Sequence, residues 1–124
     1  MWHGASYDSE VFIDATTGQA AEAIRLLNGR DRNDVYLREA SGPWIGVGGG
    51  PSHFMVTFAA AADGPFFQAV DPSMPFFPEV AIVVGGQEIR CSLQDVVNVV
   101  DATTAACDFV RTGLRSKSVS WRAR

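Results

Sequence analysis

Hydrophobic and polar residues alternate in several short segments of the chain, as they do in strands with one buried face. The clearest case is residues 53–59, where every second residue is a phenylalanine or a valine. The same alternation, or a short apolar run bounded by turn residues, predicts further strands. The predicted strands span residues 10–13, 35–38, 44–47, 53–59, 66–70, 80–84, 88–91 and 118–122.

Apolar residues recur at helical spacing in two other segments. Residues 16–27 place alanine, isoleucine and leucine on one face, and Thr16 with Gln19 forms a capping-box pattern at the start. A longer stripe follows Ser92, and Ser92 with Asp95 repeats the capping pattern. The second segment predicts a helix of about 20 residues, roughly 30 Å long.

The long predicted helix has a clear end. Gly113 supplies the left-handed residue that commonly terminates a helix, and Leu114 is expected to pack back onto Phe109. Earlier in the chain, Gly85-Gly86 lies between two predicted strands and indicates a tight hairpin. Glycine residues therefore mark both the end of the long predicted helix and the turn of the predicted hairpin.

The order of these elements predicts an α+β fold in a single domain spanning residues 1–124. Strands run consecutively in the middle, and the helices lie near the ends. This order favours a single-layer, mostly antiparallel sheet with the short N-terminal and the long C-terminal helix packed mainly on one face. No internal repeat or linker indicates a second domain.

Composition agrees with a folded protein of the cytoplasm. The chain has 124 residues, is 47% hydrophobic and has no apolar run long enough to cross a bilayer. Met1-Trp2-His3-Gly4 lacks the basic and apolar regions of a signal peptide. We therefore expect a cytoplasmic location without membrane association, where Cys91 and Cys107 stay reduced.

Charge is distributed unevenly along the chain. Residues 111–124 carry five basic side chains and no acid, and because the whole chain carries −4, residues 1–110 carry −9. An acidic surface argues against nucleic-acid binding and favours a basic partner. A net charge of a few units also serves solubility, so charge alone does not identify a partner.

The sequence shows no recognisable catalytic, cofactor or metal site. The glycine run of residues 46–50 lacks a P-loop lysine and precedes a strand, so a hairpin or bulge is the better interpretation. His3 and His53 have no second ligand at metal-binding spacing. Asp63 and Asp71 could act as a catalytic pair only if the fold brought them together. We expect no enzymatic activity and no cofactor.

Residues 62–79 combine aromatic residues with four prolines. Prolines stiffen a connection, and aromatic and methionine side chains are enriched in protein interfaces. Acidic residues would give this patch a negative rim. The residues predicted to bind a partner protein are Asp63, Phe67, Asp71, Met74, Phe76, Phe77 and Glu79. The alternative is that Phe66, Phe76 and Phe77 cover the open end of the sheet.

The C-terminal segment resembles a known family. The run from Cys107 to Arg115, followed by Val119-Ser120-Trp121, is similar to the C-terminal signature of small bacterial immunity proteins. That signature is a helix ending in an aromatic residue, then Thr-Gly, a basic residue, usually a proline, and a strand with a tryptophan. Ser116 stands where the proline is expected.

The resemblance implies that the chain protects a cell from a toxin encoded beside it, often a nucleic-acid deaminase or nuclease. We expect an acidic, aromatic surface to occlude the active site of the cognate toxin. The alternative is a small-molecule-binding or minor enzymatic domain with a pocket between helix and sheet. Tyr36, Trp44 and His53 are the candidate lining of that pocket.

Overall fold

The computed structural model describes residues 9–124, which form two α-helices and eight strands. The strands are β1 (Glu10–Ile13), β2 (Asp34–Arg38), β3 (Trp44–Gly49), β4 (Phe54–Ala59), β5 (Phe66–Val70), β6 (Val80–Val84), β7 (Gln87–Cys91) and β8 (Ser120–Ala123). The helices are α1 (Thr17–Arg25) and α2 (Val99–Thr112). A 3₁₀ turn, η1, spans Leu93–Asp95.

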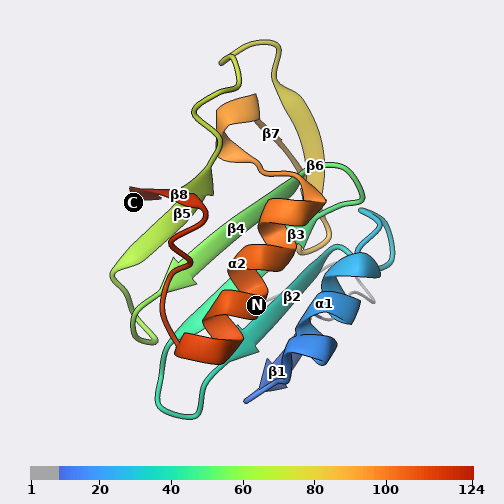
Figure 1. Cartoon of the computed structure of the whole chain (residues 1–124). Helices are drawn as coiled ribbons and strands as arrows, with labels where there is room; N and C mark the ends of the chain where they lie inside the picture. The colour runs from blue at the N-terminus through green and yellow to red at the C-terminus, as the bar shows by residue number, and fades with distance from the viewer. Residues whose placement is uncertain (1–8) are drawn as a thin grey trace.

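Six strands form one sheet in the order β1-β2-β3-β4-β5-β8 (Figure 1). β1 and β2 are parallel and are joined by the crossover helix α1, and all the other neighbours are antiparallel. The prediction of an α+β fold with a mainly antiparallel sheet is thus confirmed for the residues described. β6 and β7, however, leave this sheet and pair only with each other.

Both helices cover the same face of the six-stranded sheet. α2 contacts β3 and β4, while α1 contacts β2 and α2 (Figure 1). Because side chains alternate along each strand, every second side chain points into the space between the sheet and the helices. The largest completely buried side chains there are Phe54, Phe109, Ile24, Leu37, Ile45, Val35, Val47 and Val56.

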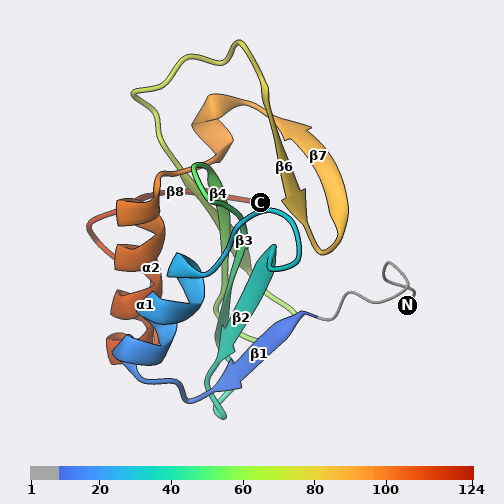
Figure 2. The same cartoon turned by 90° about the vertical axis from the view of Figure 1, so that its right-hand side faces the viewer.

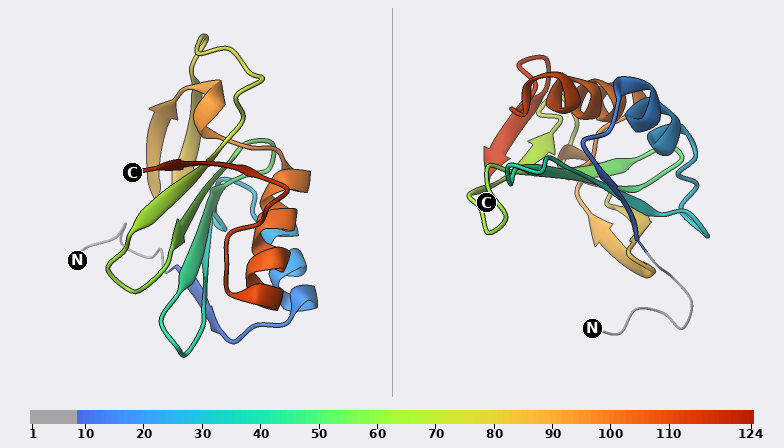
Figure 3. Two further views of the ribbon diagram at one scale, coloured as in Figure 1. Left: turned by 60° about the vertical axis from the view of Figure 1, so that its left-hand side comes forward. Right: turned by 90° about the horizontal axis from the view of Figure 1, so that it is seen from below.

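The β6-β7 hairpin lies on the other side of the sheet from the helices (Figures 2 and 3). A second, smaller apolar cluster is centred on Ile82, Cys91 and Val96, with Met55 of β4 packed against it. The predicted Gly85-Gly86 turn is confirmed, since both glycines have positive φ, of 60° and 82°. The Gly86 N–H donates to Asn33 Oδ1 at 2.9 Å, which ties the turn to the residue before β2.

The C-terminal helix is shorter than predicted. Ser92 does accept a hydrogen bond from the Gln94 N–H, but it starts only the 3₁₀ turn. Val97 then exchanges two backbone hydrogen bonds with Phe54, of 2.8 and 2.9 Å, which holds the chain in extended conformation. α2 begins after Asn98, whose side chain caps it, and runs for 14 residues.

The end of α2 at Gly113 is predicted correctly, but the packing of Leu114 is not. Gly113 adopts φ 72° and its N–H donates to Phe109 O, as a left-handed helix stop does. Leu114, by contrast, is 64% exposed and does not pack back onto Phe109. Its N–H donates to Thr112 Oγ1 at 3.1 Å, which directs the chain away from the helix.

At the other helix, the predicted capping box is present. The Gln19 N–H donates to Thr16 Oγ1, and the Thr16 N–H donates to Gln19 Oε1. Neither helix, within residues 9–124, has the length and apolar character that crossing a bilayer requires.

Candidate functional site: an exposed aromatic loop and a hollow on the open face

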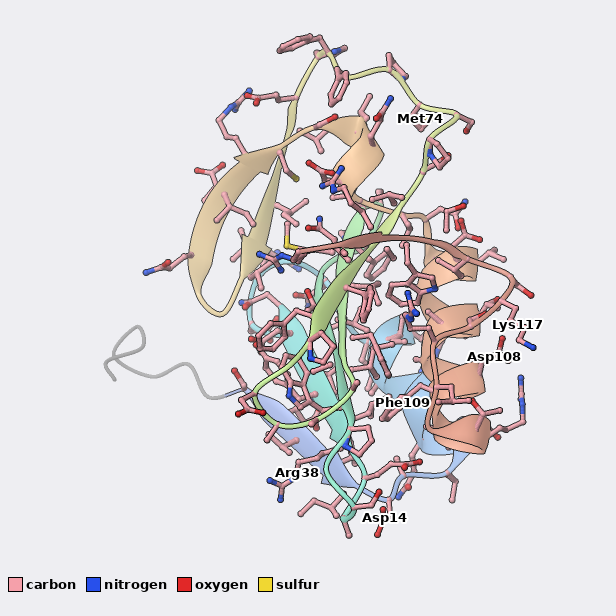
Figure 4. The ribbon with its side chains drawn as sticks, turned by 90° about the vertical axis from the view of Figure 1, so that its left-hand side faces the viewer. Asp14, Arg38, Met74, Asp108, Phe109 and Lys117 are labelled. Carbon is pink, nitrogen blue, oxygen red and sulfur yellow. The ribbon has the colours of Figure 1, made fainter. Side chains whose placement is uncertain are left out.

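The connection between β5 and β6 carries a group of exposed apolar side chains. Residues 71–79, here called the aromatic loop, form one extremity of the molecule (Figure 1). Phe76 is 59% exposed, Phe77 76% and Met74 36%. Figure 4 shows Met74 on this outlying segment, far from the helix that carries Phe109. Phe76 and Phe77 therefore do not cover the end of the sheet.

Hydrogen bonds hold the first half of the aromatic loop against η1. The Asp71 N–H donates to Gln94 O at 2.9 Å, and Gln94 Nε2 donates to Met74 O at 2.7 Å. Within the loop, both the N–H and the hydroxyl of Ser73 donate to Asp71 Oδ1. Three prolines further restrict the backbone. Met74 thus projects from a segment that hydrogen bonds hold in place, and the prolines restrict the backbone on either side of Phe76 and Phe77.

The predicted acidic rim is thinner than the sequence indicates. The Asp71 carboxylate serves the internal turn with Ser73. Glu79 is exposed, and its Oε1 lies 3.7 Å from Arg90 Nε on the neighbouring hairpin. An exposed ion pair of this length contributes little to stability. Glu79 is therefore the carboxylate of the rim that is available to a partner.

The structure separates Asp63 and Phe67 from the other predicted partner-binding residues. Asp63 lies in the β4-β5 connection, at the opposite end of β5 from Asp71. β5 is about 16 Å long at 3.3 Å per residue, so these two carboxylates do not form a catalytic pair. Phe67 faces the helices, 6.2 Å from the Phe58 ring, with the Arg115 guanidinium 3.7 Å from its own ring centroid.

A second candidate site lies on the sheet face that the helices leave uncovered. Here a hollow of about 590 Å³, called the open-face hollow below, lies between β2, β3, β4, the end of β5 and the β6-β7 hairpin. Its apolar walls come from Tyr36, Trp44, Phe66, Met55 and Val84, and its polar side chains are Asp34, Thr57 and Arg124.

Two glycines of β3 lie at the base of the open-face hollow, beneath the side chains of Tyr36 and Val84. A Cβ on Gly46 would lie 2.8 Å from Tyr36 Cε1, and one on Gly48 would lie 2.5 Å from Val84 Cγ1. Only glycine therefore lets the Tyr36 ring and the hairpin approach the sheet this closely. The glycine run continues strand β3 to Gly49 and then turns into β4, with the Gly50 N–H donating to His53 O at 2.8 Å, so the expected hairpin is confirmed at the end of the run.

Aromatic contacts fix one wall of the hollow. The rings of Tyr36 and Trp44 meet edge to face with centroids 5.8 Å apart, and Trp44 and Phe66 are 6.0 Å apart. Trp44 Nε1 donates to Ala62 O, which sets the orientation of the indole. Burial, with a smaller effect of the Asp34 charge, raises the pKa of Tyr36, so its hydroxyl stays protonated at neutral pH.

The hollow is not where a ligand pocket was expected. Tyr36 and Trp44 line it as predicted, but it lies on the face opposite the helices, and His53 is not part of its lining. On the helix side, a gap beside Leu37 and Phe109 measures only about 20 Å³. Two of the three residues proposed to line a pocket between helix and sheet, Tyr36 and Trp44, thus lie on the opposite face of the sheet.

The basic C-terminal residues do not form one patch. Arg111 pairs with Asp108 and Arg122 with Asp95, while Arg115 covers Phe67. Both cysteines are free, and burial raises the pKa of each thiol, which disfavours the reactive thiolate. No group of three or more histidine, cysteine or acidic side chains within residues 9–124 could hold a metal ion.

Comparison with known proteins leaves the chain without an assigned family. The sequence matches no protein-family model, and no curated protein matches it significantly. The similarity to immunity proteins therefore rests on residues 107–121 alone.

Proposed function

We propose that this protein is an immunity protein that binds a cognate bacterial toxin and blocks it by occupying its surface. The observation that carries the proposal is the grouping of Met74, Phe76 and Phe77 on one exposed loop, whose first half is held by hydrogen bonds to η1. The chain itself would perform no reaction. Its resemblance to immunity proteins supports a toxin that deaminates or cleaves nucleic acid.

Exposing two adjacent phenylalanine side chains to water is unfavourable, and the free energy falls when another surface covers them. Within residues 9–124, neither Phe76 nor Phe77 packs its ring against another aromatic ring, and both side chains are more than half exposed. Large apolar side chains at the centre of an interface dominate its binding energy. A partner that buried both rings would therefore gain most of its affinity from this loop.

The hydrogen bonds of the loop support the same role. Because Gln94 and Ser73 already fix the segment from Asp71 to Met74, less conformational entropy is lost when a partner binds. Such preorganisation is what a tight inhibitor needs.

Charge supports a basic partner. The whole chain carries −4, because the −9 of residues 1–110 exceeds the +5 of residues 111–124, and a negative net charge accelerates encounter with a positively charged protein. Enzymes that act on nucleic acid need a basic groove for the phosphate backbone. We propose that the aromatic loop enters or overlaps this groove in the cytoplasm of the producing cell, without contact with nucleic acid or membrane.

The test is calorimetric titration of the chain with the toxin encoded beside its gene. We expect the double variant Phe76→Ser/Phe77→Ser to raise the Kd at least 100-fold, because interface hot spots contribute about 2 kcal/mol or more each. Val100→Ser is the matched control, since Val100 is 66% exposed on α2, away from the loop. Equal affinities of the double variant and the control would contradict the proposal.

A further inference from the structure

We propose that the open-face hollow binds a planar aromatic molecule that carries a carboxylate. This site is separate from the aromatic loop, and the inference does not depend on toxin binding. Its volume of about 590 Å³ lies within the range of small-molecule sites, which are mostly apolar with a few placed polar groups.

The shape of the hollow favours a flat ligand. At its base the Tyr36 ring lies over Gly46 and the Val84 side chain lies over Gly48, because neither glycine has a side chain that would hold them off the sheet. Trp44 and Phe66 form one side, and Val84 of the hairpin forms another. Aromatic rings gain from offset or edge contacts with such walls in addition to the area that they bury.

Arg124 supplies a positive charge that favours a negatively charged group on the ligand. Its N–H donates to Phe66 O at 3.0 Å, which continues the β5-β8 pairing and places the residue at the mouth of the hollow. Its Nη1 lies 3.4 Å from Thr57 Oγ1. Within residues 9–124, no acidic side chain forms an ion pair with this guanidinium. A carboxylate fits the planar fork of an arginine with two parallel hydrogen bonds.

The other charged group of the hollow sets the direction of binding. Asp34 lies on β2, two strands from Thr57, and accepts a hydrogen bond from Ser9 Oγ at 3.0 Å. Its negative charge disfavours a ligand carboxylate at that end. The ligand anion is therefore expected beside Arg124 and Thr57, with the ring against the aromatic walls of Tyr36, Trp44 and Phe66.

A pair of probes with one shape and different charge tests the inference. We would titrate the full chain with 2-naphthoate and with the neutral 2-naphthamide, by calorimetry and by amide NMR shifts. We expect 2-naphthoate to bind about tenfold more tightly, the effect of one charge-assisted contact at a partly exposed site. Shifts should centre on the amides of Gly46, Gly48 and Thr57.

Arg124→Gln provides the decisive variant, because the side chain is exposed and its removal leaves the core intact. We expect it to remove the preference for 2-naphthoate and to leave the affinity for 2-naphthamide unchanged. Arg90→Gln, which removes an exposed arginine of β7, should preserve the preference. Equal binding of both probes to the unmodified chain, no saturable binding at millimolar concentration, or shifts centred outside the hollow would each overturn the inference.

Discussion

Ser116 organises the chain between α2 and β8. Its buried hydroxyl donates to Asp108 Oδ2 at 2.6 Å and accepts from the Ser118 N–H, while its carbonyl accepts from Trp121 Nε1 at 2.9 Å. The proline of the immunity-protein signature could supply the carbonyl but not the hydroxyl. The departure from the signature at this residue thus adds two hydrogen bonds.

These bonds predict a pH-dependent cost for Ser116→Ala. The Ser116 hydrogen bond, with a further one from Arg111, lowers the pKa of Asp108 below its ordinary value of 3.8, and partial burial opposes both. A lowered carboxyl pKa stabilises the fold above the unfolded-state pKa, and this stability is lost as the pH falls through the folded-state pKa.

We therefore expect Ser116→Ala to lower the free energy of unfolding by about 2 kcal/mol at neutral pH. Urea denaturation of both proteins from neutral pH to below pH 3.8 would show the difference shrinking at the acidic end. A difference that stays constant over that range would show that Asp108 is not the partner that matters.

Trp121 offers a second test at the residue scale. The indole lies 6.3 Å from the Phe58 ring and is only half-buried. We expect Trp121→Ala to lower the unfolding free energy by about 3 kcal/mol, at the lower end for aromatic truncation. Trp121→Phe should lower it by about 1 kcal/mol, the contribution of the hydrogen bond to Ser116 O. Thermal melting of both variants measures this, and an unchanged melting temperature for Trp121→Ala would exclude a core role.

Glu79 tests the charge of the aromatic loop better than Asp71 does, because replacing Asp71 would also remove the turn with Ser73. We expect Glu79→Lys to slow association with a basic toxin severalfold at low salt, with little change in stability. Stopped-flow mixing with Glu79→Gln as an intermediate case would measure this. Equal association rates for all three proteins would remove Glu79 from the encounter surface.

At the scale of elements, local patterns predicted most segments but not how they pair. The alternation around Phe54 and the capping box at Thr16 identify their elements within a residue or two. The departure of the β6-β7 hairpin from the main sheet and the pairing of β8 with β5 depend on contacts between distant residues. Alternation along one strand does not specify its neighbours, so the sequence could not predict these.

The same limit explains the errors at the candidate sites. Phe66 and Phe67 are adjacent phenylalanines on β5, and only the pairing of the strand decides that Phe67 faces the helices and Phe66 the hollow. The exposed group of Met74, Phe76 and Phe77 was predictable, because prolines keep that segment out of the sheet. The open-face hollow depends on three strands and a hairpin meeting over Gly46 and Gly48.

The start of α2 gives a prediction for an element. The helical spacing of Val96 and Val97 pointed to a start at Ser92, but the two backbone bonds between Val97 and Phe54 keep this part extended. We expect Asn98→Ala to lower the unfolding free energy by about 1 kcal/mol, because Asn98 caps a 14-residue helix. Ser92→Ala should cost less, since it caps only η1. Chemical denaturation with the reverse order would contradict this assignment.

At the scale of the whole molecule, the helices and the C-terminal network hold the sheet, and two surfaces remain for binding. The aromatic loop is an exposed projection that suits contact with another protein. The hollow is concave and lined mostly by apolar side chains, as small-molecule sites are. The two lie on different parts of the fold, so variants of Phe76 and of Arg124 separate their roles.

Inhibition by occupancy differs from enzymatic inactivation in its stoichiometry. We would titrate a fixed amount of the active toxin with increasing amounts of this protein and measure the residual toxin activity after different incubation times. The proposed mechanism predicts a linear fall to an end point at one molecule per toxin, independent of incubation time. Complete loss of toxin activity at a small fraction of an equivalent, increasing with time, would show turnover and contradict the account.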